Sequence, residues 1–164
     1  MAALTPGTTA PGILLKDSEG KTASLAEALK KGPVLAAFFK VSCPTCQFTF
    51  PFLERMYEMY GGNNVTFLAI SQNDARDTRE FMREFGTKFQ VLIDDRGYPV
   101  SKQYGLTNVP SLFWITSDGN IRATSIGFAK ADLEKIAAEA ASASGKSEQA
   151  LFKPGEVVPE YKPG

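Results

Sequence analysis

Four short, predominantly apolar runs are the strongest structural signal in the sequence. They cover residues 33–39, 65–70, 89–93 and 111–115. Runs of this length with little polar alternation are typical of strands buried on both faces, as in parallel or mixed sheets. We therefore predict a central sheet that is covered by other elements on both sides.

Between these runs, apolar positions recur at helical spacing. Residues 44–60 repeat apolar side chains at roughly helical intervals, and residues 74–85 are amphipathic and end at Gly86. Both patterns predict helices. Three further helices are expected at residues 25–29, capped by Ser24, at residues 100–104, and at the alanine-rich residues 131–143.

Turn signals complete the architecture. Residues 17–21 predict a turn between two short strands, and residues 116–120 predict a hairpin into a strand at 121–125. The order of elements predicts an α/β three-layer sandwich, with a mixed central sheet flanked by helices and an antiparallel end. The predicted organisation is an extended leader at 1–12, one domain at 13–143, and a tail at 144–164 that is extended on the domain or loose in solvent.

Composition and charge narrow the classes of partner. Hydrophobic residues make up 43% of the chain and charged residues 22%, with 18 basic and 18 acidic side chains. This balance argues against nucleic acid and anionic membranes as partners. No apolar run is long enough to span a membrane, and the first residues lack the pattern of a signal peptide. We expect a cytoplasmic protein as written, or a periplasmic one if the natural chain carries a leader.

The number and spacing of the cysteines give the first indication of the chemistry. The chain has two cysteines, Cys43 and Cys46, and no histidine. A four-ligand zinc site of the usual Cys/His kind cannot be built from these residues, and Cys–His or Ser–His nucleophile pairs are excluded. We therefore expect no metal. The C-x-x-C pair is either redox-active or two small apolar residues that fill space.

The position of this pair favours redox chemistry. Cys43 and Pro44 follow a predicted buried strand and open a predicted helix. A cysteine at a helix N-terminus lies where free backbone N–H groups and the helix dipole stabilise a thiolate, and the second cysteine falls one turn inside. Proline suits the first helical turn. We assign Cys43 as the attacking nucleophile and Cys46 as the resolving thiol.

The sequence at this point resembles the thioredoxin superfamily, in particular the TlpA-like disulfide reductases and redoxins. The resemblance rests on residues 38–46, Pro51, residues 108–111 and Gly127, and residues 73–86 resemble a helix that TlpA-like proteins insert. It implies a thioredoxin-like fold with a cis-proline loop. A cis bond before Pro110 would let the backbone next to it pair with an extended substrate segment beside the cysteines.

We expect four residues around the cysteine pair to bind substrate: Pro44, Thr45, Val109 and Pro110. The chain departs from thioredoxins proper at two positions. Ala37 stands where those proteins have a buried acid that helps to move the proton of the resolving thiol, and Ser42 replaces a tryptophan. Lys40 is the nearest charged residue in sequence and is a candidate for proton transfer, although a lysine at the end of a strand is more often only solvated.

The leading functional hypothesis is a protein-disulfide reductase type of thiol-disulfide oxidoreductase. It would need no cofactor beyond the redox-active Cys43–Cys46 disulfide, would act as a monomer on protein substrates, and would draw on an unidentified thiol reductant. A thiol peroxidase is the alternative, but Lys40 stands where the peroxidase pattern places threonine. A third hypothesis is a binding module that is not catalytic. Residues 94–97 predict a solvated turn rather than a metal site.

Overall fold

A computed structural model describes residues 2–62 and 64–164, so the predicted leader is described from residue 2 onward. The predicted strands and helices are present within one or two residues of their expected limits. The helices are α1 Leu25–Leu29, α2 Pro44–Tyr60, α3 Ala75–Phe85, α4 Pro99–Gln103 and α5 Lys130–Ser144. The strands are β1 Leu14–Asp17, β2 Thr22–Ser24, β3 Val34–Phe39, β4 Thr66–Ser71, β5 Gln90–Ile93, β6 Ser111–Ile115, β7 Ile121–Ile126, β8 Phe128–Ala129 and β9 Tyr161–Lys162.

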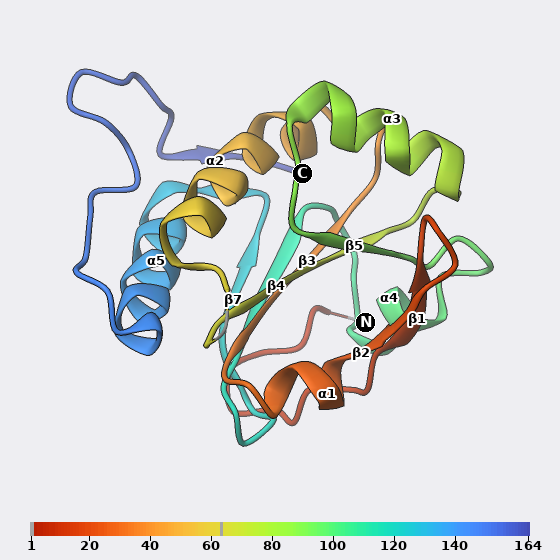
Figure 1. Ribbon diagram of the computed structural model, residues 1–164. Coiled ribbons are helices and arrows are strands. Elements are labelled where there is room, and N and C mark those ends of the chain that lie inside the picture. The colour runs from red at the N-terminus through yellow and green to blue at the C-terminus, as the bar shows by residue number, and fades with distance from the viewer. Residues whose placement is uncertain (1, 63) are drawn as a thin grey trace.

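Seven of these strands form one mixed sheet in the order β2-β1-β5-β4-β3-β6-β7 (Figure 1). The central strands β3, β4 and β5 are parallel, and the neighbouring strands β1 and β6 run antiparallel to them. A second, two-stranded sheet pairs β8 with β9. The mixed α/β sandwich predicted from the sequence is therefore confirmed, whereas β8 and β9 were not predicted.

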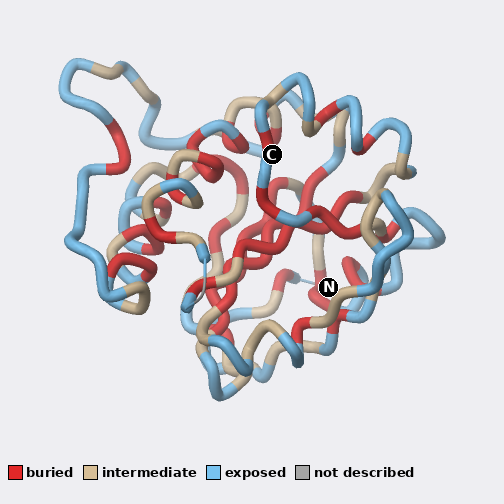
Figure 2. The backbone as a smooth tube through the Cα atoms, viewed as in Figure 1, coloured by how far each residue is buried: buried red, intermediate tan, exposed pale blue. Residues whose placement is uncertain are grey.

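Both faces of the central sheet are buried, and β3 shows how the sequence produces this. All six residues of β3 are buried, and they alternate between two apolar cores. Leu35, Ala37 and Phe39 face the core formed with α2, α3 and α5, and the intervening residues face the core formed with α1 and α4. Figure 2 shows this buried centre surrounded by exposed helix faces and loops. The apolar run identified in the sequence is thus a strand covered on both sides.

The N-terminal residues lie along the sheet. The backbone of Gly7 donates to Ile121 at the start of β7, and Ile121 donates to Thr8. Leu4 donates to Tyr104, and Ala3 is buried in the core beside α4. In the described residues, no helix is both long enough and apolar enough to cross a membrane.

The C-terminal tail also lies on the domain. It runs past α5 and α2 and returns to the first turn of α2 (Figure 1). Phe152 packs in the core against Phe52 and Phe128, with ring centroids 5.1 and 6.1 Å away. Arg55 of α2 donates to both carboxylate oxygens of Glu156, at 2.8 and 3.0 Å. These contacts fix the middle of the tail against the helix that carries the cysteines.

The Arg55–Glu156 pair makes the anchoring of the tail dependent on pH. The hydrogen bonds from Arg55 and from the backbone of Lys153 lower the pKa of Glu156 from 4.5 to about 2. A carboxyl whose pKa is depressed in the folded state adds stability above its unfolded pKa, and this contribution is lost as the pH falls from about 4.5 towards about 2. We expect Glu156→Gln to lower the free energy of unfolding at neutral pH but not near pH 2.

Chemical denaturation of both proteins across this pH range measures the effect. Glu148→Gln is the matched control, because Glu148 is an exposed tail carboxylate that forms no ion pair among the residues described. A difference between Glu156→Gln and the unaltered chain that stays constant with pH would contradict the assignment.

Candidate active site

Cys43 lies at the carboxyl end of β3 and caps the first turn of α2. Its Sγ accepts a hydrogen bond from the backbone N–H of Cys46 at 3.1 Å, and Pro44 is the first helical residue. The helix forms here because Pro44 has no N–H to satisfy and Cys43 supplies the acceptor that a capping residue provides. The predicted strand-to-helix junction is therefore confirmed, with the sulfur facing the positive end of the helix dipole.

The loop that precedes β6 meets this sulfur from the opposite side. The Cys43 thiol donates to the carbonyl oxygen of Val109 at 3.4 Å, and the bond between Val109 and Pro110 is cis, as expected. The loop is held by the Ser111 hydroxyl, which donates to Asn108 at 2.7 Å, and by the N–H of Gly127, which donates to Pro110 at 2.8 Å. Residues far apart in sequence thus converge on Cys43.

The second cysteine is in a different environment. Cys46 is fully buried, whereas Cys43 is half-buried, and neither cysteine is in a disulfide in this structure. Burial raises the pKa of the Cys46 thiol, and its hydrogen bond to Cys43 and the charge of that neighbour raise it further. The site therefore has one thiol that reaches solvent and one that is shielded and keeps its proton.

The other predicted site residues occupy separate positions around Cys43. Pro44 is exposed at the start of α2, and Thr45 is buried with its hydroxyl donating to the carbonyl of Pro163 at 2.6 Å. Lys40 has an exposed side chain and lines, with Val109, a hollow of about 210 Å³. Its ammonium group pairs with no carboxylate in residues 2–62 and 64–164. Its proton-transfer role stays a prediction.

Two residues that support the site were not identified from the sequence. The side chain of Asn73 accepts from the backbone N–H of Val41 at 3.0 Å, and Gln47 donates to the carbonyl of Val41 at 2.8 Å. Together they fix the turn that leads from β3 into Cys43. The sequence gives no signal for this pairing, because Asn73 follows β4 and is 32 residues from Val41.

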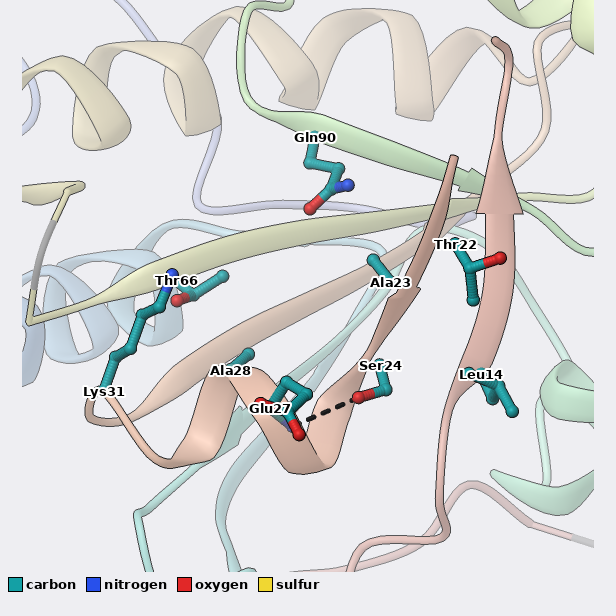
Figure 3. A pocket seen from close by; sticks show the side chains of 9 residues that line it. All are labelled: Leu14, Thr22, Ala23, Ser24, Glu27, Ala28, Lys31, Thr66 and Gln90. Carbon is teal, nitrogen blue, oxygen red and sulfur yellow. Dashed lines mark hydrogen bonds between the residues drawn. The ribbon is translucent and has the colours of Figure 1, made fainter. Parts of the chain in front are cut away.

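The hollow shown in Figure 3 lies away from Cys43. It has a volume of about 420 Å³ and lies between α1, the β1–β2 ribbon and the first residues of β4 and β5. These strands are parallel to β3, and Cys43 follows the end of β3, so the hollow lies at the opposite edge of the sheet. Among the residues described, no group of three or more Cys, Asp or Glu side chains could hold a metal ion.

Several proteins that resemble this chain in sequence or fold are named for thiol-disulfide chemistry. The chain is 30% identical over 121 residues to the thiol-disulfide oxidoreductase ResA of Geobacillus thermodenitrificans, which covers 73% of this chain and 68% of that protein. The thioredoxin domain of a thiol-disulfide oxidoreductase from Bacteroides vulgatus superposes with a TM-score of 0.74 at 22% identity, covering 84% of this chain and 98% of that one.

A peroxidoxin from Mycobacterium tuberculosis also superposes, with a TM-score of 0.69 at 19% identity over 87% of this chain and 97% of that one. At these identities the solved structures establish the shared fold alone. The family model described as Redoxin matches residues 5–141, which include both cysteines and the cis-proline loop. With its thioredoxin-like sheet and its paired thiols at the start of α2, the chain belongs to the Redoxin family.

Proposed function

We propose that this chain is a thiol-disulfide oxidoreductase that reduces disulfide bonds in protein substrates through Cys43 and Cys46. The observation that carries the proposal is the position of Cys43, whose sulfur caps α2 and accepts the N–H of Cys46 at 3.1 Å. Backbone N–H groups at a helix N-terminus stabilise a thiolate, which is the attacking species in disulfide exchange. The similarity to ResA proteins supports the same activity.

The reaction follows from the different environments of the two thiols. The Cys43 thiolate attacks one sulfur of the substrate disulfide, which forms a mixed disulfide and releases the other substrate sulfur as a thiolate that takes up a proton. Cys46, deprotonated, then attacks the Cys43 sulfur, forms the Cys43–Cys46 disulfide and releases the second substrate thiol. The substrate gains two electrons, both from the enzyme dithiol, and two protons, one lost by Cys46 and one taken from solvent.

Burial of Cys46 sets the order of these steps. Because burial and the contact with Cys43 raise the pKa of its thiol, Cys46 stays protonated while Cys43 is in its reduced form. Formation of the mixed disulfide removes the negative charge from Cys43 and with it one of the causes of the raised pKa. The resolving attack is thereby favoured after the first step has occurred.

The reaction requires a reductant and no additional cofactor. A dithiol must return the Cys43–Cys46 disulfide to the reduced form, and no cofactor beyond this disulfide takes part. We propose that the protein works as a monomer, because the nucleophile, the resolving thiol and the cis-proline loop all come from one chain. The cytoplasmic location expected from the sequence stays a prediction that cell fractionation would check.

The Cys46→Ser variant tests the proposal directly. Without a resolving thiol, the mixed disulfide should persist, so the variant incubated with an oxidised protein such as insulin is expected to form a covalent adduct. Mass spectrometry should find one insulin molecule on Cys43, released by dithiothreitol. The matched control is the Cys43→Ser variant, which keeps the buried thiol and should form no adduct.

Two results would overturn the proposal. One is the absence of an adduct on Cys43 although the insulin disulfides are open to attack, as their slow reduction by dithiothreitol alone would show. The other is turnover of hydrogen peroxide by the reduced protein at a rate far above its exchange with insulin, which would favour a thiol peroxidase.

A further inference from the structure

The last residues of the chain lie beside the residues that surround Cys43. We call residues 160–164 the strap. The backbone N–H of Lys130 donates to Glu160 at 3.0 Å, and β9 of the strap pairs antiparallel with β8, with Phe128 opposite Lys162. The strap therefore lies as an added strand along β8, in the part of the molecule where α5 begins.

The strap reaches the catalytic groups themselves. Thr45 of the C-x-x-C motif donates its hydroxyl hydrogen to the carbonyl of Pro163 at 2.6 Å. Gly164 lies so close to Val109 that a β-carbon at position 164 would overlap the Val109 carbonyl oxygen. This same oxygen accepts the hydrogen bond of the Cys43 thiol. The end of the strap thus lies next to the nucleophile and against the cis-proline loop.

Gly127, directly before β8, leaves room for the strap. Gly127 adopts a φ of +75°, and a β-carbon there would lie 2.5 Å from the carbonyl oxygen of Lys162. A side chain at this position would therefore push the strap away from β8. The surface formed by Thr45, Val109, Gly127 and β8 accommodates a polypeptide in extended conformation with its backbone close to the domain.

On this basis, and resting on the proposed function, we propose that the strap takes the position of an extended substrate segment beside Cys43 and thereby inhibits the chain's own active site. The strap must be displaced before a disulfide-bearing protein binds. The strap and a bound substrate would occupy the same space. A substrate sulfur has to reach Cys43, and a polypeptide that carries it past Val109 needs the room that Pro163 and Gly164 occupy. The strap contains no cysteine, so it fills the site without reacting.

The way the strap is held is suited to displacement. Upstream, the tail is fixed by buried Phe152 and by the pair between Arg55 and Glu156. None of the residues of the strap is buried. Besides its backbone hydrogen bonds to β8, it has an ion pair between Glu160 and Lys130 at 3.9 Å and Lys162 placed 5.1 Å from the centroid of the Phe48 ring. Such a tethered segment competes at a high effective concentration, yet it can leave while its anchor remains in place.

The test compares the full chain with a variant that ends at Pro159. If the strap covers the site nine-tenths of the time, its removal raises the apparent affinity for a protein substrate about tenfold. We therefore expect kcat/KM for insulin reduction to rise by about this factor. A small aromatic disulfide contacts less of this surface, so its kcat/KM should rise less. A peptide with the sequence of residues 158–164, added to the shortened variant, should inhibit it competitively against insulin.

A second variant acts without shortening the chain. In Gly164→Val the new side chain would overlap Val109, so the end of the strap should be released and kcat/KM for insulin should rise in the same direction. Val157→Ala is the matched control, because the Val157 side chain in the same tail is 95% exposed. It should behave as the unaltered chain does.

The rate at which iodoacetamide alkylates Cys43 separates this inference from the proposed function, because it needs no exchange activity. The shortened variant should be alkylated faster than the full chain even if neither reduces insulin, which would contradict the proposed function alone. If alkylation and kcat/KM for insulin both change less than twofold, the strap does not cover the site. A fall in kcat/KM on shortening would also overturn the inference, since the strap would then belong to the productive site.

Discussion

The Cys43→Ser variant is expected to lose disulfide reduction by roughly a thousand-fold or more, down to the rate of dithiothreitol alone. Serine cannot form the mixed disulfide, so no part of the two-step reaction remains. The fold should be unaffected, because a serine Oγ at the N-cap accepts the Cys46 N–H as well as sulfur does, and serine is among the preferred capping residues. Insulin reduction with dithiothreitol as the electron source measures the loss.

Ser42→Ala is the control for this experiment. Ser42 is exposed, stands next to Cys43 in sequence and carries no assigned role, so its replacement should leave the rate unchanged. The melting temperature of Cys43→Ser should stay close to that of the unaltered chain. Retention of more than a few per cent of the activity in Cys43→Ser would mean that another group performs the first attack.

The Phe50→Ala variant is expected to lower the free energy of unfolding by about 3–5 kcal/mol. Phe50 lies on α2 one turn beyond Cys46, is fully buried, and packs against Phe39, Phe81 and Phe89 with ring centroids 4.4, 5.3 and 6.0 Å away. Its removal takes away one ring from a cluster that joins α2 to β3 and α3. Urea denaturation followed by circular dichroism gives the change.

Phe50→Leu is the matched variant for that measurement. Leucine keeps most of the apolar volume but not the ring contacts, so its loss should be clearly smaller than that of alanine. A change of less than about 1 kcal/mol in Phe50→Ala would show that the cluster does not hold α2 in place. It would also weaken the view that this helix provides a rigid base for the two cysteines.

The parts of the fold that were predictable are those whose signal is local. Residues 34–39 have the pattern of a buried strand because each of them faces a core, and α2 begins where a capping residue meets a proline. The same features place the cysteine pair at a strand-to-helix junction. Local sequence therefore predicted both the architecture and the position of the two cysteines.

The parts that escaped prediction depend on contacts between distant segments. Strands β8 and β9 have two residues each, and their pairing exists only because the tail returns across the domain. The support of Val41 by Asn73 is of the same kind. No periodicity marks such pairs, since they are set by the packing of elements already formed.

The predicted turn at residues 94–97 was wrong in one respect. Asp95 is exposed as expected, but Asp94 is buried, and its carboxylate accepts hydrogen bonds from the N–H groups of Val100 and Ser101 and from the Ser101 hydroxyl. It thus supplies acceptors for the first turn of α4. The neighbouring acid and the following glycine suggested a solvated loop, because nothing in residues 94–97 shows that the Asp94 side chain turns back onto the helix predicted to follow.

The hydrogen bonds made by residues 4–10 bear on the behaviour of the protein at high concentration. β7 is the last strand of the large sheet, and such a strand offers unpaired backbone groups to other molecules. Here Gly7 and Thr8 engage Ile121 at its start. The N-terminal residues thereby cover this edge strand and hinder its pairing with a strand of another molecule. A chain that lacks them would be prone to self-association along β7.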